Sequence, residues 1–102
     1  MPKIARGNGT ETVNTNHGCD TTTTSNACSG NVFANSIGVV RKGDENTPHL
    51  KDPAPCTTHS VAMSSNMSPN EFVNGKNAAF LGSGYGGEVI TTGSSNVFVN
   101  GR

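Results

Sequence analysis

The apolar residues of this chain occur in short alternating runs, and three of these runs repeat one pattern. Each copy has a Ser, an Asn two residues later, a Phe two residues after that, and a second Asn two residues beyond the Phe. This alternation is typical of a strand, so we predict that the neighbours of the Phe face the side opposite to it. The copies begin at Ser29, Ser68 and Ser94 and centre on Phe33, Phe72 and Phe98. Such a repeat predicts three similar structural units.

Turn residues close two of the copies, and further short runs precede them. Asn74-Gly75 and Asn100-Gly101 are typical of a tight hairpin turn, because both positions take positive φ. Upstream lie "SVAM" at 60–63 and "EVIT" at 88–91, while "TTTT" at 21–24 holds the matching place before the first copy. We interpret the threonine run as an edge strand, with a low-complexity linker as the alternative. The prediction is a single domain, 1–102, with hairpin repeats at about 21–44, 60–83 and 88–102.

Helical signals are missing from the sequence. No window places apolar residues three and four apart over a useful length, and Gly or Pro interrupts most stretches, so we predict an all-β fold. The stretch from Arg41 to Cys56 contains three prolines and is predicted to be a long connecting loop. "GSGYGG" at 82–87 is predicted to be a flexible turn, because a nucleotide-binding loop would need a strand before it and a helix after it.

Composition limits how such a chain can be stabilised. Hydrophobic residues make up 31% of the chain and there is no Trp, so burial alone would struggle to offset chain entropy, and a metal, disulfides or a partner surface should contribute. The net charge is zero and the charges are scattered, which argues against nucleic-acid binding. No secretory signal or membrane span is recognisable, so we expect a soluble protein made in the bacterial cytoplasm without a signal peptide.

Three histidines and one cysteine are candidate metal ligands. His49, Cys56 and His59 follow one another closely, and His17 comes from the N-terminal segment "TNHGCD". Zn²⁺ prefers four such ligands in a tetrahedron, and a closed set of four is typical of a structural site. Three cysteines cannot all pair with one another, and in a reducing compartment metal ligation is the better use of a thiolate. The alternative is that these are exposed loop histidines and a small buried cysteine.

The other cysteines and the acidic residues leave further alternatives open. Cys19 could replace Cys56 as a ligand, whereas Cys28 is predicted to be a packed small side chain and a Cys19–Cys28 disulfide is disfavoured in the cytoplasm. A Cys-His hydrolase would need a third, orienting group. A catalytic zinc would need a nearby base, for which Asp44 and Glu45 are the candidates. We therefore predict that the protein is not an enzyme.

Together these features resemble the PAAR-repeat family of spike tips in type VI secretion systems and contractile phage tails, of the T-even phage type in particular. The segment from Asn74 to Phe80, "NGKNAAF", matches the family's N-G-K-P-A-A-R except at the Pro and the Arg. His17-Gly18 looks like the family's early His-Gly, and Cys56 to His59 like its C-P-x-H. No copy keeps the literal Pro-Ala-Ala-Arg, which suggests a diverged, phage-type member. The resemblance covers nearly the whole chain.

The resemblance implies a small conical fold of three β-hairpin repeats with pseudo-three-fold symmetry and a zinc ion near its apex. By position, the ligands would be His17, His49, Cys56 and His59. The implied function is to cap a trimeric β-helical spike, one tip per trimer, and to sharpen it for piercing a membrane. The implied site of action is the tail spike of a virion or a secretion spike, where a cargo effector could also dock. We expect the repeated Phe residues to pack against one another or against the spike, and no fused toxin domain to follow Arg102.

Two other functions remain as alternatives. A small zinc enzyme acting on cell-envelope components would show an open coordination position with bound water. A stand-alone β-rich binding module would stay monomeric when mixed with spike trimers.

Overall fold

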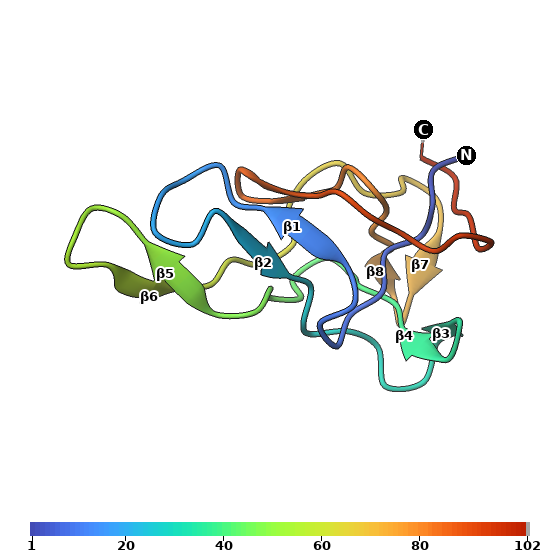
Figure 1. Cartoon of the computed structure of the whole chain (residues 1–102). Coiled ribbons are helices and arrows are strands. Elements are labelled where there is room, and N and C mark those ends of the chain that lie inside the picture. The colour runs from blue at the N-terminus through green and yellow to red at the C-terminus, as the bar shows by residue number, and fades with distance from the viewer. Residues whose placement is uncertain (102) are drawn as a thin grey trace.

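The computed structural model describes residues 1–101, and these contain ten short strands and no helix, as the sequence predicts (Figure 1). The strands are β1 (Thr12–Asn14), β2 (Thr22–Thr24), β3 (Phe33–Ala34), β4 (Ile37–Gly38), β5 (His49–Lys51), β6 (Thr57–His59), β7 (Phe72–Val73), β8 (Lys76–Asn77), β9 (Gly84–Tyr85) and β10 (Glu88–Ile90). No helix that could cross a membrane occurs among these residues.

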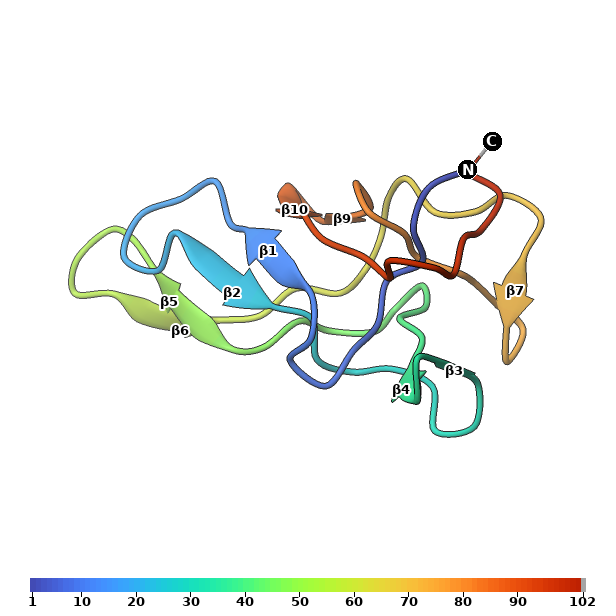
Figure 2. The same ribbon diagram turned by 45° about the vertical axis from the view of Figure 1, so that its right-hand side comes forward.

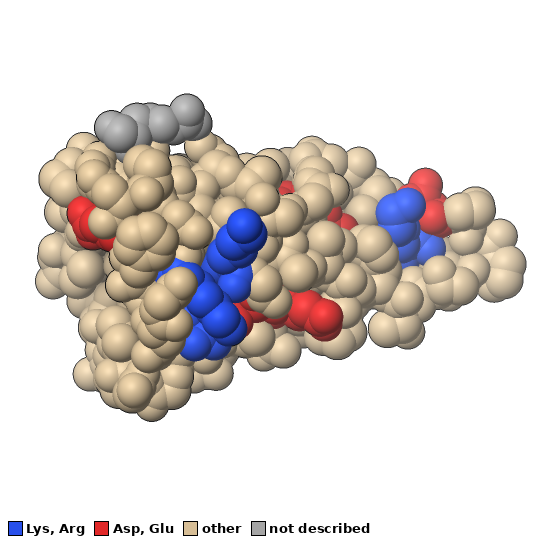
Figure 3. Space-filling view, turned by 180° about the vertical axis from the view of Figure 1, so that it is seen from behind, with Lys and Arg blue, Asp and Glu red and all other residues tan. Residues whose placement is uncertain are grey.

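The molecule is elongated and tapers. Its principal extents are 40 × 25 × 24 Å, and its outline narrows from one end to the other (Figure 3). The β5–β6 hairpin forms the narrow end, whereas β3, β4, β7, β8 and the N-terminus lie at the broad end (Figures 1 and 2).

Four antiparallel strands link the two ends in the order β2-β1-β10-β9. The threonine run therefore forms an edge strand, as predicted, with Thr22–Thr24 paired to Thr12–Asn14. β-branched side chains suit such a half-exposed position.

Two expected loops contain strands instead. The stretch from Arg41 to Cys56 was predicted to be a connecting loop, but β5 lies within it and pairs with β6. The prolines Pro53 and Pro55 fall in the connection between these strands, where no ladder N–H is needed. The flexible turn expected at 82–87 is divided into two turns, one at Gly82 and one at Gly86-Gly87, all three glycines at positive φ. Between them Gly84–Tyr85 pairs with β10 as β9.

Two of the three repeats form hairpins with the same turn. β3 pairs with β4 and β7 with β8. Asn74 and Gly75 have φ of 55° and 78°, as an Asn-Gly hairpin turn requires, and Asn35 and Ser36 repeat this geometry at 54° and 65°. Ser36 thus adopts a conformation that normally favours glycine.

The third hairpin is assembled from both ends of the chain, which the sequence reading missed. The Val99 N–H donates to the Pro2 carbonyl at 3.0 Å, and Lys3 forms a bridge with Phe98. The N-terminal segment therefore supplies the second strand that the C-terminal copy lacks.

A closed ring of backbone hydrogen bonds gives the broad end pseudo-three-fold symmetry. The Ala5 N–H donates to Ala79 O (3.1 Å), the Ala79 N–H to Val40 O (3.0 Å), and the Val40 N–H to Ala5 O (3.0 Å). Each unit thus donates to one neighbour and accepts from the other.

Side chains repeat the same cycle. The second Asn of each copy donates to the first Asn of a neighbouring copy: Asn35 to Asn96 (2.7 Å), Asn74 to Asn31 (2.8 Å) and Asn100 to Asn70 (2.9 Å). The repeated pattern noticed in the sequence is therefore a set of contacts between units.

The apolar core consists of two layers along this pseudo-three-fold axis. One layer contains Ile4, Ala34, Val39, Val73, Ala78, Phe80 and Val99, and the other contains Ala5, Val13, Val40, Met63, Ala79, Tyr85 and Ile90. The repeated Phe residues belong to neither layer, so the expectation that they form a shared interior is wrong: Phe33, Phe72 and Phe98 are 58%, 58% and 47% exposed. The residue after each Phe is buried instead, since neighbouring side chains of a strand face opposite sides.

Candidate metal centre

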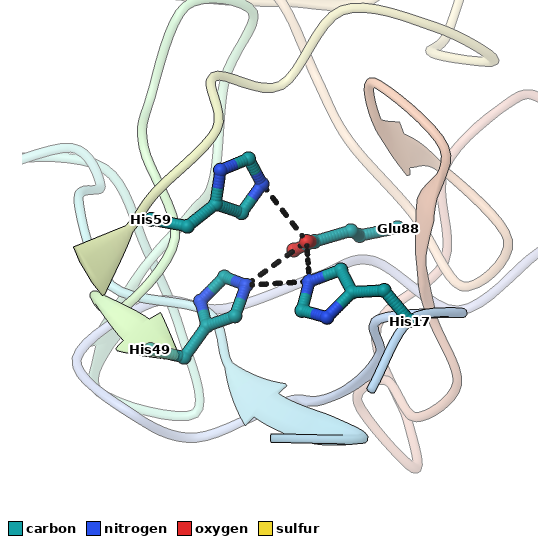
Figure 4. A group of neighbouring side chains, drawn as sticks. All are labelled: His17, His49, His59 and Glu88. Carbon is teal, nitrogen blue, oxygen red and sulfur yellow. Dashed lines mark hydrogen bonds and ion pairs between the residues drawn. The ribbon is translucent and has the colours of Figure 1, made fainter. Parts of the chain in front are cut away.

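Four side chains from separate segments of the chain converge on one point (Figure 4). His49 begins β5, His59 ends β6 and Glu88 begins β10, while His17 lies in the connection from β1 to β2. The Oε2 atom of Glu88 lies 2.7 Å from Nε2 of His17, 2.9 Å from Nε2 of His49 and 3.2 Å from Nε2 of His59. One atom of each residue thus points into a common space.

Strand register explains the convergence of two of these ligands. His49 and His59 are direct partners in the antiparallel β5–β6 ladder, and directly opposite residues project on the same face of a sheet. Their ring centroids lie 5.1 Å apart. The β5–β6 hairpin therefore presents an imidazole pair, which His17 and Glu88 complete from neighbouring segments.

Backbone carbonyls fix the orientation of two imidazoles. Nδ1 of His17 lies 2.9 Å from Gly18 O, and Nδ1 of His49 lies 2.8 Å from Thr47 O. A carbonyl only accepts, so each Nδ1 carries the proton and, in the neutral ring, each Nε2 presents a lone pair. Such hydrogen bonds are the usual way in which proteins orient metal-binding histidines.

The lone pairs on the imidazole nitrogens therefore face one another and the Glu88 carboxylate. Nε2 of His17 and Nε2 of His49 are 3.3 Å apart, and both approach the Glu88 carboxylate. With neutral rings no proton lies between these atoms, so a positive charge is needed to hold them together. A bound cation or protonated imidazoles would supply that charge.

Glu88 is buried and held as a carboxylate. Burial acts to raise its pKa, but hydrogen bonds from His49, Asn46 and His17, the imidazoles donating in their protonated form, outweigh burial and lower the pKa below its usual range. The Asn46 amide donates to Oε1 at 2.8 Å, which leaves Oε2 directed toward the imidazoles. A carboxylate so placed is suited to act as a ligand.

The dimensions of the group fit a divalent metal. The four ligand atoms all lie within 4.8 Å of one another. Zinc–nitrogen bonds of about 2.0–2.1 Å in a tetrahedron place ligand atoms about 3.3–3.4 Å apart, and Nε2 of His17 and Nε2 of His49 are 3.3 Å apart. The Glu88 oxygen lies closer, 2.7 to 3.2 Å from the imidazoles, and would separate slightly from them around an ion. His17, His49, His59 and Glu88 could therefore hold a metal ion, which would cross-link four segments of the chain.

The group of four candidate ligands contains no cysteine, whereas the predicted ligand set included Cys56. Cys56 forms a disulfide with Cys19, so neither sulfur is available as a thiolate. Cys28 is a free, partly buried cysteine that packs against the core, in line with its predicted role. Sequence reasoning grouped Cys56 with the histidines because of its short spacing from His59, whereas the structure brings Glu88 to the histidines.

Glu88 was missed because it lies far along the chain from the histidines. The sequence did show it as the first residue of the short run "EVIT". An acidic residue at the start of an otherwise apolar strand was the available signal, since buried carboxylates need a partner. The two candidates for a catalytic base lie elsewhere: Asp44 pairs with Arg41 at 2.9 Å, and exposed Glu45 accepts from Ser60.

A scan against protein-family models and a search of curated proteins found no match for this chain. The structure itself defines the class: a small all-β protein with an internal pseudo-three-fold repeat and a candidate metal centre of three imidazoles and one carboxylate.

Proposed function

We propose that this protein is a metal-stabilised tip, of the PAAR-repeat type that its sequence resembles. In this proposal it caps the trimeric β-helical spike of a contractile injection machine, either a phage tail or a type VI secretion system. One tip per trimer would sharpen the spike for piercing a cell envelope. Three equivalent exposed Phe side chains at the pseudo-three-fold broad end are the observation that carries the proposal.

Symmetry supports a trimeric partner. The repeated contacts give a single chain three near-identical surfaces around one axis. A homotrimer with a three-fold axis presents the same patch three times, so one such chain can meet all three subunits alike. The open strand edges at the end of a β-helix would be covered in the same contact.

Exposed apolar side chains support a docking surface. Phe33, Phe72 and Phe98 are each about half exposed or more, although the chain is poor in large apolar residues. Their repetition at equivalent positions of three units is what a partner with three-fold symmetry could contact. The expectation that these residues pack against the spike therefore remains part of the proposal.

The narrow end supports a piercing role. Both apolar layers are built largely from the repeat segments, and the β5–β6 hairpin adds no residue to either layer. Zinc is the proposed metal, because imidazole and carboxylate oxygen are common zinc ligands. A zinc ion bound by the three histidines and Glu88 would hold the β5–β6 hairpin rigidly, and the Cys19–Cys56 disulfide would be a second cross-link.

The decisive experiment is to mix the full chain with trimeric fragments of candidate spikes and measure co-migration and mass. We expect one chain per trimer. A variant with Phe33→Ser, Phe72→Ser and Phe98→Ser should lose the complex while keeping its fold. Leu50→Ser is the matched control, because Leu50 is 44% exposed but lies in β5 at the narrow end.

Failure to bind any spike trimer, with a chain that stays monomeric, would favour the stand-alone binding module. The same mixture tests whether a cargo effector joins the complex. The zinc-enzyme alternative has weaker support, because Asp44 and Glu45 are engaged away from the centre and Glu88 lies among the ligands.

A further inference from the structure

A cavity of about 340 Å³ opens directly onto the candidate metal centre. His17, His59 and Glu88 form part of its wall, together with Asn16, Lys51 and Gly87. His49 is not in this wall and lies 5% exposed. A metal held by the four residues could therefore be approached through this cavity.

His59 is the least constrained ligand on that side. Its side chain is 31% exposed, compared with 10% for His17 and 3% for His49. Carbonyl groups hold Nδ1 of His17 and Nδ1 of His49, whereas no partner for Nδ1 of His59 occurs among residues 1–101. Ligands without such support are bound less firmly, so the corner facing the cavity is the one where another ligand can enter.

Lys51 lies on the same side of its strand as a metal ligand. In β5, His49 and Lys51 are two residues apart, and side chains at this spacing project on one face. Lys51 also lines the cavity, and its ammonium group forms no ion pair with any other described residue. This amine is available to a bound molecule.

The charges of the cavity do not balance once a metal is present. A divalent ion and the Lys51 ammonium carry three positive charges, and Glu88 supplies the one carboxylate among the described residues of the wall. The surplus of two positive charges lies in a partly enclosed space, where opposite charges attract more strongly than in bulk water.

We propose that the metal-loaded protein binds a phosphate-type oxyanion in this cavity, between the metal and Lys51. The inference rests on the metal site of the proposed function and adds a ligand to it. Phosphate matches the surplus charge, and its oxygens suit both a divalent ion and an ammonium donor. Inorganic phosphate and the phosphate of a lipid headgroup share this chemistry.

The test uses the full chain loaded with Co²⁺, whose visible absorption reports its ligands. Inorganic phosphate should change that spectrum saturably, and the metal-free protein should not bind it. Lys51→Met should weaken phosphate binding by about tenfold or more, the equivalent of one charge-assisted hydrogen bond. Lys76→Met is the control, because Lys76 is an exposed residue of β8 at the broad end.

A second arm separates the sources of phosphate. Sedimentation with vesicles of phosphatidic acid, but not of phosphatidylcholine, and its reversal by inorganic phosphate would identify the lipid headgroup. Phosphate binding without sedimentation would identify the free anion.

Cobalt bound at one equivalent with no response to phosphate would overturn this inference and leave the metal site standing. An equal response in the Lys51→Met variant would overturn it too. Failure to bind cobalt at all would remove the metal site, and the phosphate site with it.

Discussion

Replacing Glu88 by Gln tests the metal centre most directly. The substitution keeps the size of the side chain, and the remaining oxygen can still accept from Asn46. It removes the negative charge that lies within 3.2 Å of three imidazole nitrogens. The metal-free variant should fold as well as the metal-free wild-type protein, since the new amide can donate to an imidazole lone pair. Metal affinity should fall.

The expected size of the effect follows from linkage between binding and folding. At a metal concentration 100 times the Kd of the wild-type protein, binding adds about 2.7 kcal/mol to the free energy of unfolding. For a domain of this size, Tm should then rise by about 11–22 °C. If Glu88→Gln weakens binding about 100-fold, the same metal concentration adds only about 0.4 kcal/mol, and Tm rises by about 2–3 °C.

Calorimetry with and without zinc would measure both rises, and metal analysis of the purified proteins would give the stoichiometry. Glu45→Gln is the matched control, because Glu45 is an exposed carboxylate that accepts a hydrogen bond from Ser60. A Glu88→Gln protein with the full metal-dependent rise in Tm would refute the assignment of Glu88 as a ligand.

Three further predictions concern the rest of the molecule. Replacing Cys19 and Cys56 by Ser should cost about 4 kcal/mol of stability in urea unfolding, because the disulfide spans 37 residues; metal stoichiometry should stay the same, and its loss would restore Cys56 as a ligand. Tyr85→Phe should leave Tm unchanged or raise it, since the buried Tyr85 hydroxyl has no hydrogen-bond partner among the described residues; a marked fall would reveal a hidden partner. A permuted chain with joined ends and an opening between Asn35 and Ser36 should fold and show the same metal-dependent Tm rise, because that turn is equivalent to the split third hairpin; an unfolded product would contradict the symmetry.

The sequence predicts the all-β class and the repeated hairpin turn, but not which face of each strand is buried. Alternation correctly separates Phe33 from Ala34 and Phe72 from Val73 onto opposite sides. Hydrophobicity alone suggested that the larger side chain would be inside. The inward positions of the three repeats are Ala34, Val73 and Val99, and one large ring, that of Phe80, belongs to the same layer.

The third repeat could not be recognised as a hairpin from the sequence, because its two strands lie at opposite ends of the chain. Ile4-Ala5 occupies the place that Val39-Val40 and Ala78-Ala79 take in the other units. No local pattern links residues about a hundred positions apart, whereas backbone pairing in the folded chain does.

The ligands of the candidate metal centre likewise include some that the sequence predicts and one that it does not. Nearness in sequence suggested His49 and His59, and their pairing in the β5–β6 ladder brings them together. Glu88 reaches them because β10 lies in the central sheet, beside β1 and the segment that carries His17. A ligand brought by tertiary topology leaves only a weak signal in a sequence, here a charged residue at the start of an apolar strand.

The two ends of the molecule are therefore stabilised by different interactions for one geometric reason. At the broad end three units surround an axis, so their inward side chains form an apolar core and their backbones close hydrogen-bond rings. Toward the narrow end the cross-section shrinks to a hairpin and one connection, and too few neighbours remain to bury apolar side chains. Stability there must come from bonds that need no surrounding core. The Cys19–Cys56 disulfide is one, and a metal held by three histidines and Glu88 would be the other.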